Sequence, residues 1–163
     1  MNITLKNVKY SEFMSQETNC FEAAIYIDGK RAGEVSNDGH GGANRYHPYA
    51  LEATINAYAK TLPPVVYDWA GRSSNEEPLI IGQDADTITG NLIVEWLQAR
   101  DLKKTLSKYV VYTKDDGKIY QTKFKDHKAA LAHPDLMLRV GAKRVLNFMP
   151  FEQAMALYKG VSA

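Results

Sequence analysis

The dipeptide Asp28-Gly29 stands between two segments of alternating polarity, and this arrangement constrains the fold more than any other local feature. An Asp-Gly pair readily adopts the positive φ angles of a two-residue hairpin turn. The segment before the pair has an apolar residue at every second position: Phe21, Ala23, Ile25 and Ile27. We therefore predict a strand there, its antiparallel partner at 30–36, and a first strand at 3–8.

Two longer segments have the apolar spacing of amphipathic helices. In 48–62, apolar side chains recur every three or four positions, and a proline pair follows. A longer stripe covers about 86–107, after Asp84 or Asp86, either of which can cap the helix. A second hairpin is predicted at 109–124 around a second Asp-Gly turn. Shorter elements are expected near 126–132 (helix), 144–148 (strand) and 150–159 (helix).

The order of these elements predicts the fold class. Two hairpins separated by helices, without regular βαβ alternation, indicate an α+β fold. We expect a mainly antiparallel sheet built from the two hairpins, with the two main amphipathic helices packed on one of its faces. The length of 163 residues is that of one domain, so we expect a single domain over 1–163.

The composition excludes several classes of protein. The chain has 20 Lys and Arg against 19 Asp and Glu, a formal net charge of +1. General nucleic-acid binders usually carry a clear basic excess, so we expect no general nucleic-acid binding. Cys20 is the only cysteine, which rules out an intrachain disulfide and suits a reducing compartment. No apolar signal region or membrane span is recognisable, so we expect a cytoplasmic protein without membrane contact.

Residues that can carry chemistry are concentrated in 36–48, which holds three glycines, two asparagines, one aspartate, two histidines and one arginine. Glycines let backbone N–H groups approach an anion, and a predicted helix N-terminus follows. Arg45 offers a fork for phosphate or carboxylate, and Asn37 and Asn44 can contact a base or ribose edge. The alternative is a tight connection whose polar side chains satisfy their own backbone.

This segment is our candidate site for a ligand or a protein partner. Exposed aromatic residues beside adaptable loops are typical of binding surfaces. The predicted site residues are Asn37, Asp38, His40, Asn44, Arg45, Tyr46, His47 and Tyr49. The polar connection 67–77 is a further contributor, and whether 71–78 is ordered without a partner stays open. The segment matches neither of the common glycine-rich nucleotide fingerprints.

Metal binding and nucleophilic catalysis have weaker support. His40 and His47 lie near Asp38 in sequence, but structural zinc sites normally need four ligands at recognisable spacing. We therefore predict no metal ligand, no cofactor and no catalytic residue. Cys20 begins an apolar strand, where an inert buried thiol is expected, and a Cys20–His40 pair stays an open alternative.

The middle-to-late part of the chain is locally basic. Its lysines are Lys103, Lys104, Lys108, Lys114, Lys118, Lys123, Lys125 and Lys128. On the second hairpin they can form one face that meets an acidic partner. A solvated strand face is the simpler interpretation.

The N-terminal third carries three short patterns, SQETNCFEA at 15–23, IYIDGK at 25–30 and NDGHGG at 37–42. Over residues 2–48 the chain resembles small proteins of bacteriophages and other mobile elements. The resemblance implies an accessory protein in the bacterial host cell. Proteins of this kind often act in counter-defence, by binding a host immune component or by sequestering its nucleotide signal. The resemblance supplies no catalytic residues.

These observations favour a non-catalytic binding protein that inhibits a bacterial defence system. Its partner would be a host defence protein or a small nucleotide. Two alternatives stay open. One is a small nucleotide-acting hydrolase or transferase with His40 or His47 as general base. The other is a structural or assembly module whose hairpin edges mediate oligomerisation. The ligand, the defence pathway and the oligomeric state are not determined by the sequence.

Overall fold

The computed structural model describes residues 1–67 and 77–161, and the chain forms two compact units, Met1–Val94 (unit 1) and Glu95–Ala163 (unit 2). Strands and helices are mixed in both units, so the predicted α+β class is confirmed. The boundary between the units falls inside the longest helix, α2 (Ala85–Leu106). Because that helix belongs to both units, the prediction of one domain stays a prediction.

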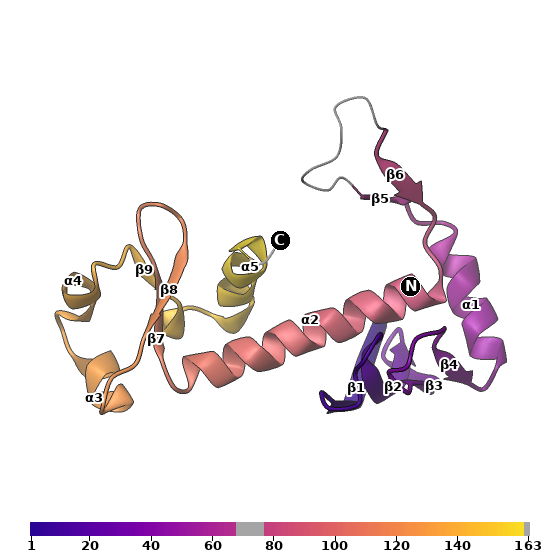
Figure 1. The fold of residues 1–163 in the computed structure, drawn as a ribbon, viewed down its shortest axis with the longest axis horizontal. Helices are drawn as coiled ribbons and strands as arrows, with labels where there is room; N and C mark the ends of the chain where they lie inside the picture. The colour runs from indigo at the N-terminus through magenta and orange to yellow at the C-terminus, as the bar shows by residue number, and fades with distance from the viewer. Residues whose placement is uncertain (68–76, 162–163) are drawn as a thin grey trace. The chain divides into compact units, whose positions relative to one another are not determined.

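Unit 1 contains a four-stranded antiparallel sheet, sheet A, in the order β1-β2-β3-β4 (Figure 1). Its strands are β1 (Ile3–Ser11), β2 (Cys20–Ile27), β3 (Lys30–Asn37) and β4 (Arg45–His47). The first hairpin is confirmed, since Asp28 and Gly29 have φ angles of 48° and 80°. The Asp-Gly turn therefore determines the pairing of β2 with β3, as its positive-φ preference predicts.

Strand β4 was not predicted. Its three residues are too few to show an alternating pattern, and pairing with β3 defines them as a strand. The glycine-rich segment 36–48 is consequently not one loop. Residues 38–44 connect two paired strands, and the residues on either side belong to the sheet.

Helix α1 (Ala50–Ala59) and the first half of α2 complete the core of unit 1. Ile25 of β2, Ile55 of α1 and Ile93 of α2 are each fully buried. Of the two predicted caps of α2, Asp84 is the real one, because its Oδ1 accepts a hydrogen bond from the Thr87 backbone N–H at 2.7 Å. The Thr87 hydroxyl lies at the same distance and lowers the pKa of Asp84.

Strands β5 (Val65–Tyr67) and β6 (Leu79–Ile81) form a separate two-stranded antiparallel sheet, sheet B. Neither strand was predicted from the sequence, because three residues are too few to show an alternating pattern. Most of the predicted 67–77 contributor, namely 68–76, lies outside the residues that the structure describes.

Unit 2 contains a three-stranded antiparallel sheet, sheet C, in the order β8-β7-β9. Its strands are β7 (Val110–Thr113), β8 (Ile119–Thr122) and β9 (Arg144–Val145). Its helices are α3 (His127–Ala132), α4 (Leu136–Val140), a 3-10 turn (Leu146–Phe148) and α5 (Phe151–Val161). The second predicted hairpin is confirmed, but it belongs to this sheet and not to sheet A.

Both faces of sheet C are covered by apolar clusters. On one face, Val111 packs in an apolar cluster with Leu102 of α2 and Met155 of α5. On the other, Val110 packs in a cluster with Leu136 of α4. Each hairpin therefore has its own core, and the long helix α2 contributes to both units.

The Asn147 side chain connects several elements of unit 2 by hydrogen bonds. Asn147 Nδ2 donates to the carbonyls of Leu106 and Tyr109 at 2.9 and 3.0 Å, and Asn147 Oδ1 accepts from the Val111 N–H at 2.8 Å. His127 Nε2 lies 3.0 Å from the same Leu106 carbonyl. These bonds satisfy a helix-terminal carbonyl that has no partner within α2.

Of the helices in residues 1–67 and 77–161, none combines the length and the apolar character needed to cross a lipid bilayer.

Candidate functional site

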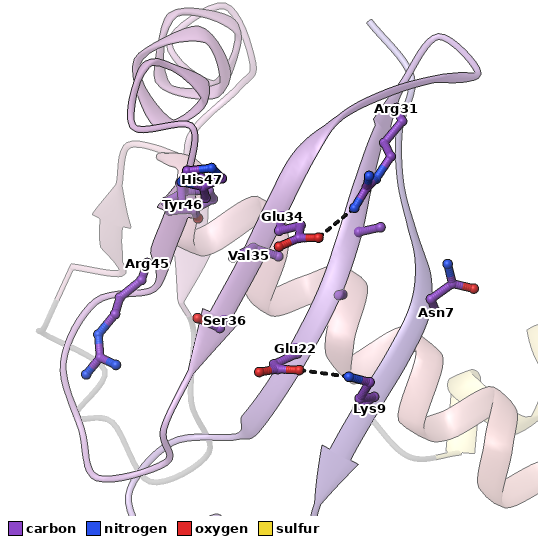
Figure 2. A pocket seen from close by; sticks show the side chains of 12 residues that line it. Asn7, Lys9, Glu22, Arg31, Glu34, Val35, Ser36, Arg45, Tyr46 and His47 are labelled. Atoms are coloured by element: carbon purple, nitrogen blue, oxygen red, sulfur yellow. Dashed lines mark hydrogen bonds and ion pairs between the residues drawn. The ribbon is translucent and has the colours of Figure 1, made fainter.

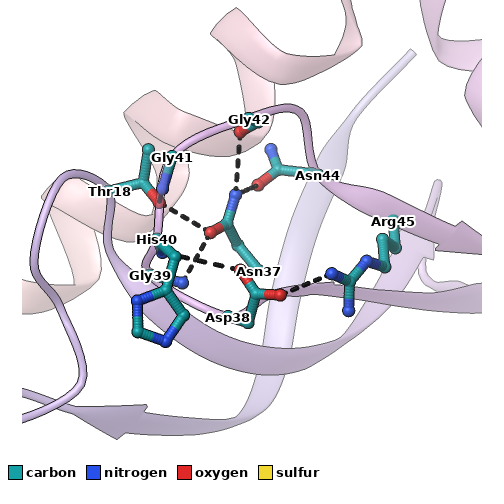
Figure 3. A network of polar contacts seen from close by, with 9 residues as sticks. All are labelled: Thr18, Asn37, Asp38, Gly39, His40, Gly41, Gly42, Asn44 and Arg45. Atoms are coloured by element: carbon teal, nitrogen blue, oxygen red, sulfur yellow. Dashed lines mark hydrogen bonds and ion pairs between the residues drawn. The ribbon is translucent and has the colours of Figure 1, made fainter.

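Asn37 organises the connection between β3 and β4 (Figure 3). Its Oδ1 accepts hydrogen bonds from the Thr18 hydroxyl at 2.7 Å and from the Gly39 N–H at 2.9 Å. Its Nδ2 donates to the Gly42 carbonyl at 3.2 Å and to Asn44 Oδ1 at 3.1 Å. All four hydrogen-bonding positions of this amide are therefore used inside the protein.

Gly39 closes the same connection against the β1–β2 loop. Its carbonyl oxygen accepts the backbone N–H groups of residues 16, 17 and 18 at 3.0, 3.0 and 3.3 Å. Gly39 has a φ of 86°, and a Cβ there would collide with the Met14 carbonyl, so only glycine fits. Convergent N–H groups of this kind can bind an anion, but here they bind a carbonyl of the same chain.

A second polar network attaches β4 to α2. The Tyr46 hydroxyl donates a hydrogen bond to Asp86 Oδ1 at 2.9 Å. The same hydroxyl oxygen lies 2.9 Å from Thr89 Oγ1. Asn44 donates its backbone N–H to Asp86 at 3.3 Å and its Nδ2 to Thr89 at 2.9 Å. Burial of Tyr46 raises the pKa of its hydroxyl above the ordinary value. The network fixes the position of β4 relative to α2.

The predicted site residues therefore fall into two groups. Asn37 and Tyr46 are buried and Asn44 is half-buried, with polar atoms engaged in the networks above. A ligand would have to displace those bonds, so the ligand role predicted for these three stays a prediction. His40, Arg45, His47 and Tyr49 are exposed and Asp38 is half-exposed, which makes this group accessible.

Arg45 and Asp38 form an ion pair beside the connection. The hydrogen bond from the Arg45 guanidinium lowers the pKa of the Asp38 carboxyl, and the His40 backbone N–H adds to this effect. Side-chain exposure is 72% for Arg45 and 42% for Asp38, so solvent screens the attraction. The guanidinium is thus held in position while most of its surface stays available to a partner.

The register of sheet A places Arg45 in a row of side chains on the face opposite the core, here called the open face. Across the four strands, Lys9 pairs with Glu22, Glu22 with Ser36, and Ser36 with Arg45. The next row contains Lys6, Ala24, Glu34 and His47. Figure 2 labels six of these side chains on the strands of sheet A: Lys9, Glu22, Glu34, Ser36, Arg45 and His47.

Most charges on the open face and at its edge occur in pairs of opposite sign, whereas the exposed Lys6 lies with its Nζ 4.2 Å from the centroid of the Tyr26 ring. Lys9 and Glu22 form a cross-strand pair with an N–O distance of 3.2 Å, and Arg31 pairs with Glu34 along β3. The pair of Arg45 with Asp38 is the third, giving three cations and three carboxylates. Such exposed pairs stabilise a fold by at most about 1 kcal/mol each, so stability alone does not explain them.

Two shallow depressions open on this surface. The first, of about 370 Å³, is lined by residues of all four strands, including Glu34, Arg45 and His47. The second, of about 390 Å³, extends toward Met14 and Cys20 in and after the β1–β2 loop. The row Lys9, Glu22, Ser36 and Arg45 lines both. The two depressions therefore form one candidate site with a mixed-charge floor.

The same surface offers little for catalysis. His40 Nδ1 lies 3.3 Å from the amide oxygen of Gln16, and within the described residues no hydrogen bond joins it to Cys20 or a carboxylate. The His47 side chain makes no hydrogen bond or ion pair with another described residue. A search of residues 1–67 and 77–161 found no cluster of three or more His, Cys, Asp or Glu able to hold a metal ion.

Sequence reasoning missed Lys9, Glu22, Arg31, Glu34 and Ser36 as members of the site. A signal was present, because the apolar alternation that identifies the core face of β2 also identifies Glu22 as facing away from it. Which residues of β1 and β4 lie beside Glu22 depends on pairing between distant segments, and no local pattern shows that.

Comparison of the chain with protein-family models, with curated proteins and with solved structures gave no match. The functional interpretation therefore depends on the geometry of the open face and on the residue patterns described above.

Proposed function

We propose that the protein is a non-catalytic binding protein whose open face of sheet A contacts a partner protein. The presence of charges of both signs on that face carries the proposal. A polyphosphate ligand would be repelled by Glu22 and Glu34, whereas a protein surface can complement charges of both signs. Mixed-charge pairs of this kind favour specific docking over general attraction.

Exposed aromatic residues beside the face support a protein partner. Phe13 is 95% exposed and is followed by Met14, which lines the second depression. Tyr49 is 82% exposed and lies two residues after His47 of the open face. Large rigid side chains at the edge of a polar surface are frequent sources of binding energy in protein interfaces.

The class of partner is proposed from the resemblance to small phage and mobile-element proteins. On that basis the partner is a component of a bacterial defence system, and binding inhibits it inside the host cell. The test is phage infection of bacterial strains that each carry one defence system and express the protein. We expect the wild-type protein to restore infection in at least one strain.

Arg45→Glu should abolish this restoration, because it reverses a charge that lines both depressions and whose side chain is 72% exposed. Lys60→Glu, an equal charge change at the exposed end of α1, is the matched control and should keep activity. A photo-crosslinking residue at position 36 should capture the defence component, and one at exposed Thr54 of α1 should not. Restoration by a folded Arg45→Glu protein would exclude the open face as the contact surface, and no restoration by wild type would exclude the defence role.

A nucleotide ligand is the second candidate, favoured by the size of the first depression and by Arg45. A volume of about 370 Å³ falls in the range of small-molecule pockets. In this case, protein denatured after purification from host cells should release an unchanged nucleotide. Release of a reaction product, with loss of turnover in His40→Ala or His47→Ala, would instead support the enzymatic alternative.

A further inference from the structure

The two units carry opposite net charges that the whole-chain value conceals. Unit 1 has 7 Lys and Arg against 12 Asp and Glu, a net charge of −5. Unit 2 has 13 against 7, a net charge of +6. The expectation of no general nucleic-acid binding used only the sum of these values. The division into units therefore reopens the question for unit 2 alone.

Four lysines of unit 2 lie at one end of the hairpin formed by β7 and β8. Val110 pairs with Thr122, so Lys108 before β7 and Lys123 after β8 lie at the same end of sheet C. The bond from His127 to the Leu106 carbonyl brings the start of α3 to the end of α2, and Lys125 and Lys128 flank that histidine. We call Lys108, Lys123, Lys125 and Lys128 the lysine cluster.

The lysine cluster is available to a partner. All four side chains are exposed, and none makes an ion pair with any described residue. Asp126 is the acidic residue within the same stretch, and its Oδ1 accepts the Ala129 N–H at 2.9 Å as the cap of α3. By contrast, Lys143 near the other end of the hairpin is paired with Asp115.

An exposed aromatic residue lies at the same end of the sheet. Phe148 is 58% exposed and follows Asn147, whose side chain binds the carbonyls of Leu106 and Tyr109. An exposed aromatic ring and unpaired lysines at one end of a sheet form an accessible surface. It is the arrangement on which an unpaired base stacks while lysines bind the phosphates on either side.

We propose that unit 2 binds single-stranded nucleic acid, with the lysine cluster on the backbone phosphates and Phe148 stacked on a base. Lysine binds phosphate as a point charge and reads no sequence, so the binding is general and strongly dependent on salt. This activity uses residues outside the open face of sheet A. It is therefore independent of the function proposed above.

The test is fluorescence anisotropy of the full chain with a labelled oligothymidylate of roughly 16 nucleotides. Binding at about 50 mM salt should weaken steeply as salt rises, with a log–log slope of about −0.7 for each phosphate bound. The variant Lys123→Gln/Lys125→Gln/Lys128→Gln should lower affinity at least about tenfold and make that slope shallower by about 2. Replacing the same three lysines by arginine should preserve binding.

The matched control is Lys114→Gln/Lys118→Gln/Lys143→Gln, which removes the same charge from the other end of the hairpin. It should lower affinity by less than about threefold if the lysine cluster is the contact. Phe148→Ala should weaken binding to the oligothymidylate but leave binding to a duplex of equal length unchanged. Absence of binding by the wild-type chain, or equal losses in the two triple variants, would overturn the proposal.

Discussion

Sheet A and sheet C have the same antiparallel pairing but differ in how many faces are covered. Sheet C lies between two apolar clusters, and all four residues of β7 are buried. Sheet A is covered on one face, and its other face carries paired charges. A sheet buried on both sides cannot present a flat surface to a partner. In unit 2 the accessible chemistry therefore lies at the ends of the strands, and in unit 1 it lies on the open face.

The first prediction concerns the polar contact that closes unit 2. Asn147→Ala removes three hydrogen bonds, and at about 1 kcal/mol each the free energy of unfolding should fall by about 3 kcal/mol. Urea unfolding followed by circular dichroism measures this change. Gln121→Ala, an exposed position of β8, is the control and should change stability by less than about 0.5 kcal/mol. Similar effects of both substitutions would mean that Asn147 does not hold the unit together.

The second prediction tests the coverage of the two sheets directly. The side chains of Val110 and Val111 point to opposite faces of sheet C. Val110→Ala and Val111→Ala should each lower the free energy of unfolding by about 2 kcal/mol, because each removes buried methyl groups. In sheet A, Val35→Ala should cost a similar amount, whereas Glu34→Ala on the open face should cost less than about 1 kcal/mol. A small effect at Val110 or Val111 would show that one face of sheet C is less covered than the structure indicates.

The third prediction addresses the network that positions β4. Tyr46→Phe keeps the ring but removes the hydroxyl bound to Asp86, and should cost about 1 kcal/mol at pH 7. Tyr49→Phe, at an exposed ring, should have almost no effect.

The pH dependence of these two variants gives a second readout. Because the folded protein raises the pKa of Tyr46 above its ordinary value of 10, the hydroxyl stabilises the fold below pH 10. That contribution should decline as the pH rises past this value, and the decline should be missing in Tyr46→Phe. If the stability of Tyr46→Phe still declined at alkaline pH as in wild type, groups other than the Tyr46 hydroxyl would be responsible for the decline.

The smallest effect is predicted for the cap of α2. The hydrogen bonds from Thr87 lower the pKa of Asp84, so its carboxylate stabilises the fold above the ordinary pKa of 3.8. This stability should be lost as the pH falls below 3.8 through the lower folded pKa. Asp84→Asn keeps a good cap and should change stability by only a few tenths of a kcal/mol at pH 7. As the pH is lowered below 3.8, the free energy of unfolding should fall less steeply in this variant than in wild type.

Local patterns were sufficient for the elements that depend on near neighbours in sequence. The turn at Asp28-Gly29 specified its own hairpin, because an Asp-Gly pair accepts the positive φ angles that the turn requires. The spacing of Leu51 and Ile55 likewise identified the buried side of α1, because residues four apart lie on the same face of a helix. The α+β class followed from the order of such elements.

Pairing between distant segments decided the rest. Arg45–His47 became a strand only by pairing with β3, and that pairing brought Arg45 beside Lys9 and Glu22 across the sheet. Asn37 looked equally suited to a ligand or to its own loop. The positions of Thr18 and Asn44 turned its amide inward. These outcomes depend on which backbones meet, and local propensity carries no information about that.

The charge of the chain shows the same division between sequence and tertiary structure. Composition determined a net charge of +1, which correctly describes the sum over all residues. The sequence also shows the basic stretch that begins at Lys103, but the boundary between the two units is set by the fold. That boundary separates the sum into −5 and +6, because each unit gathers its own part of the sequence around its own core. Salt screens the attraction between exposed charges beyond a Debye length of about 10 Å. A partner therefore responds to the local charge of a unit and not to the net charge of the whole chain.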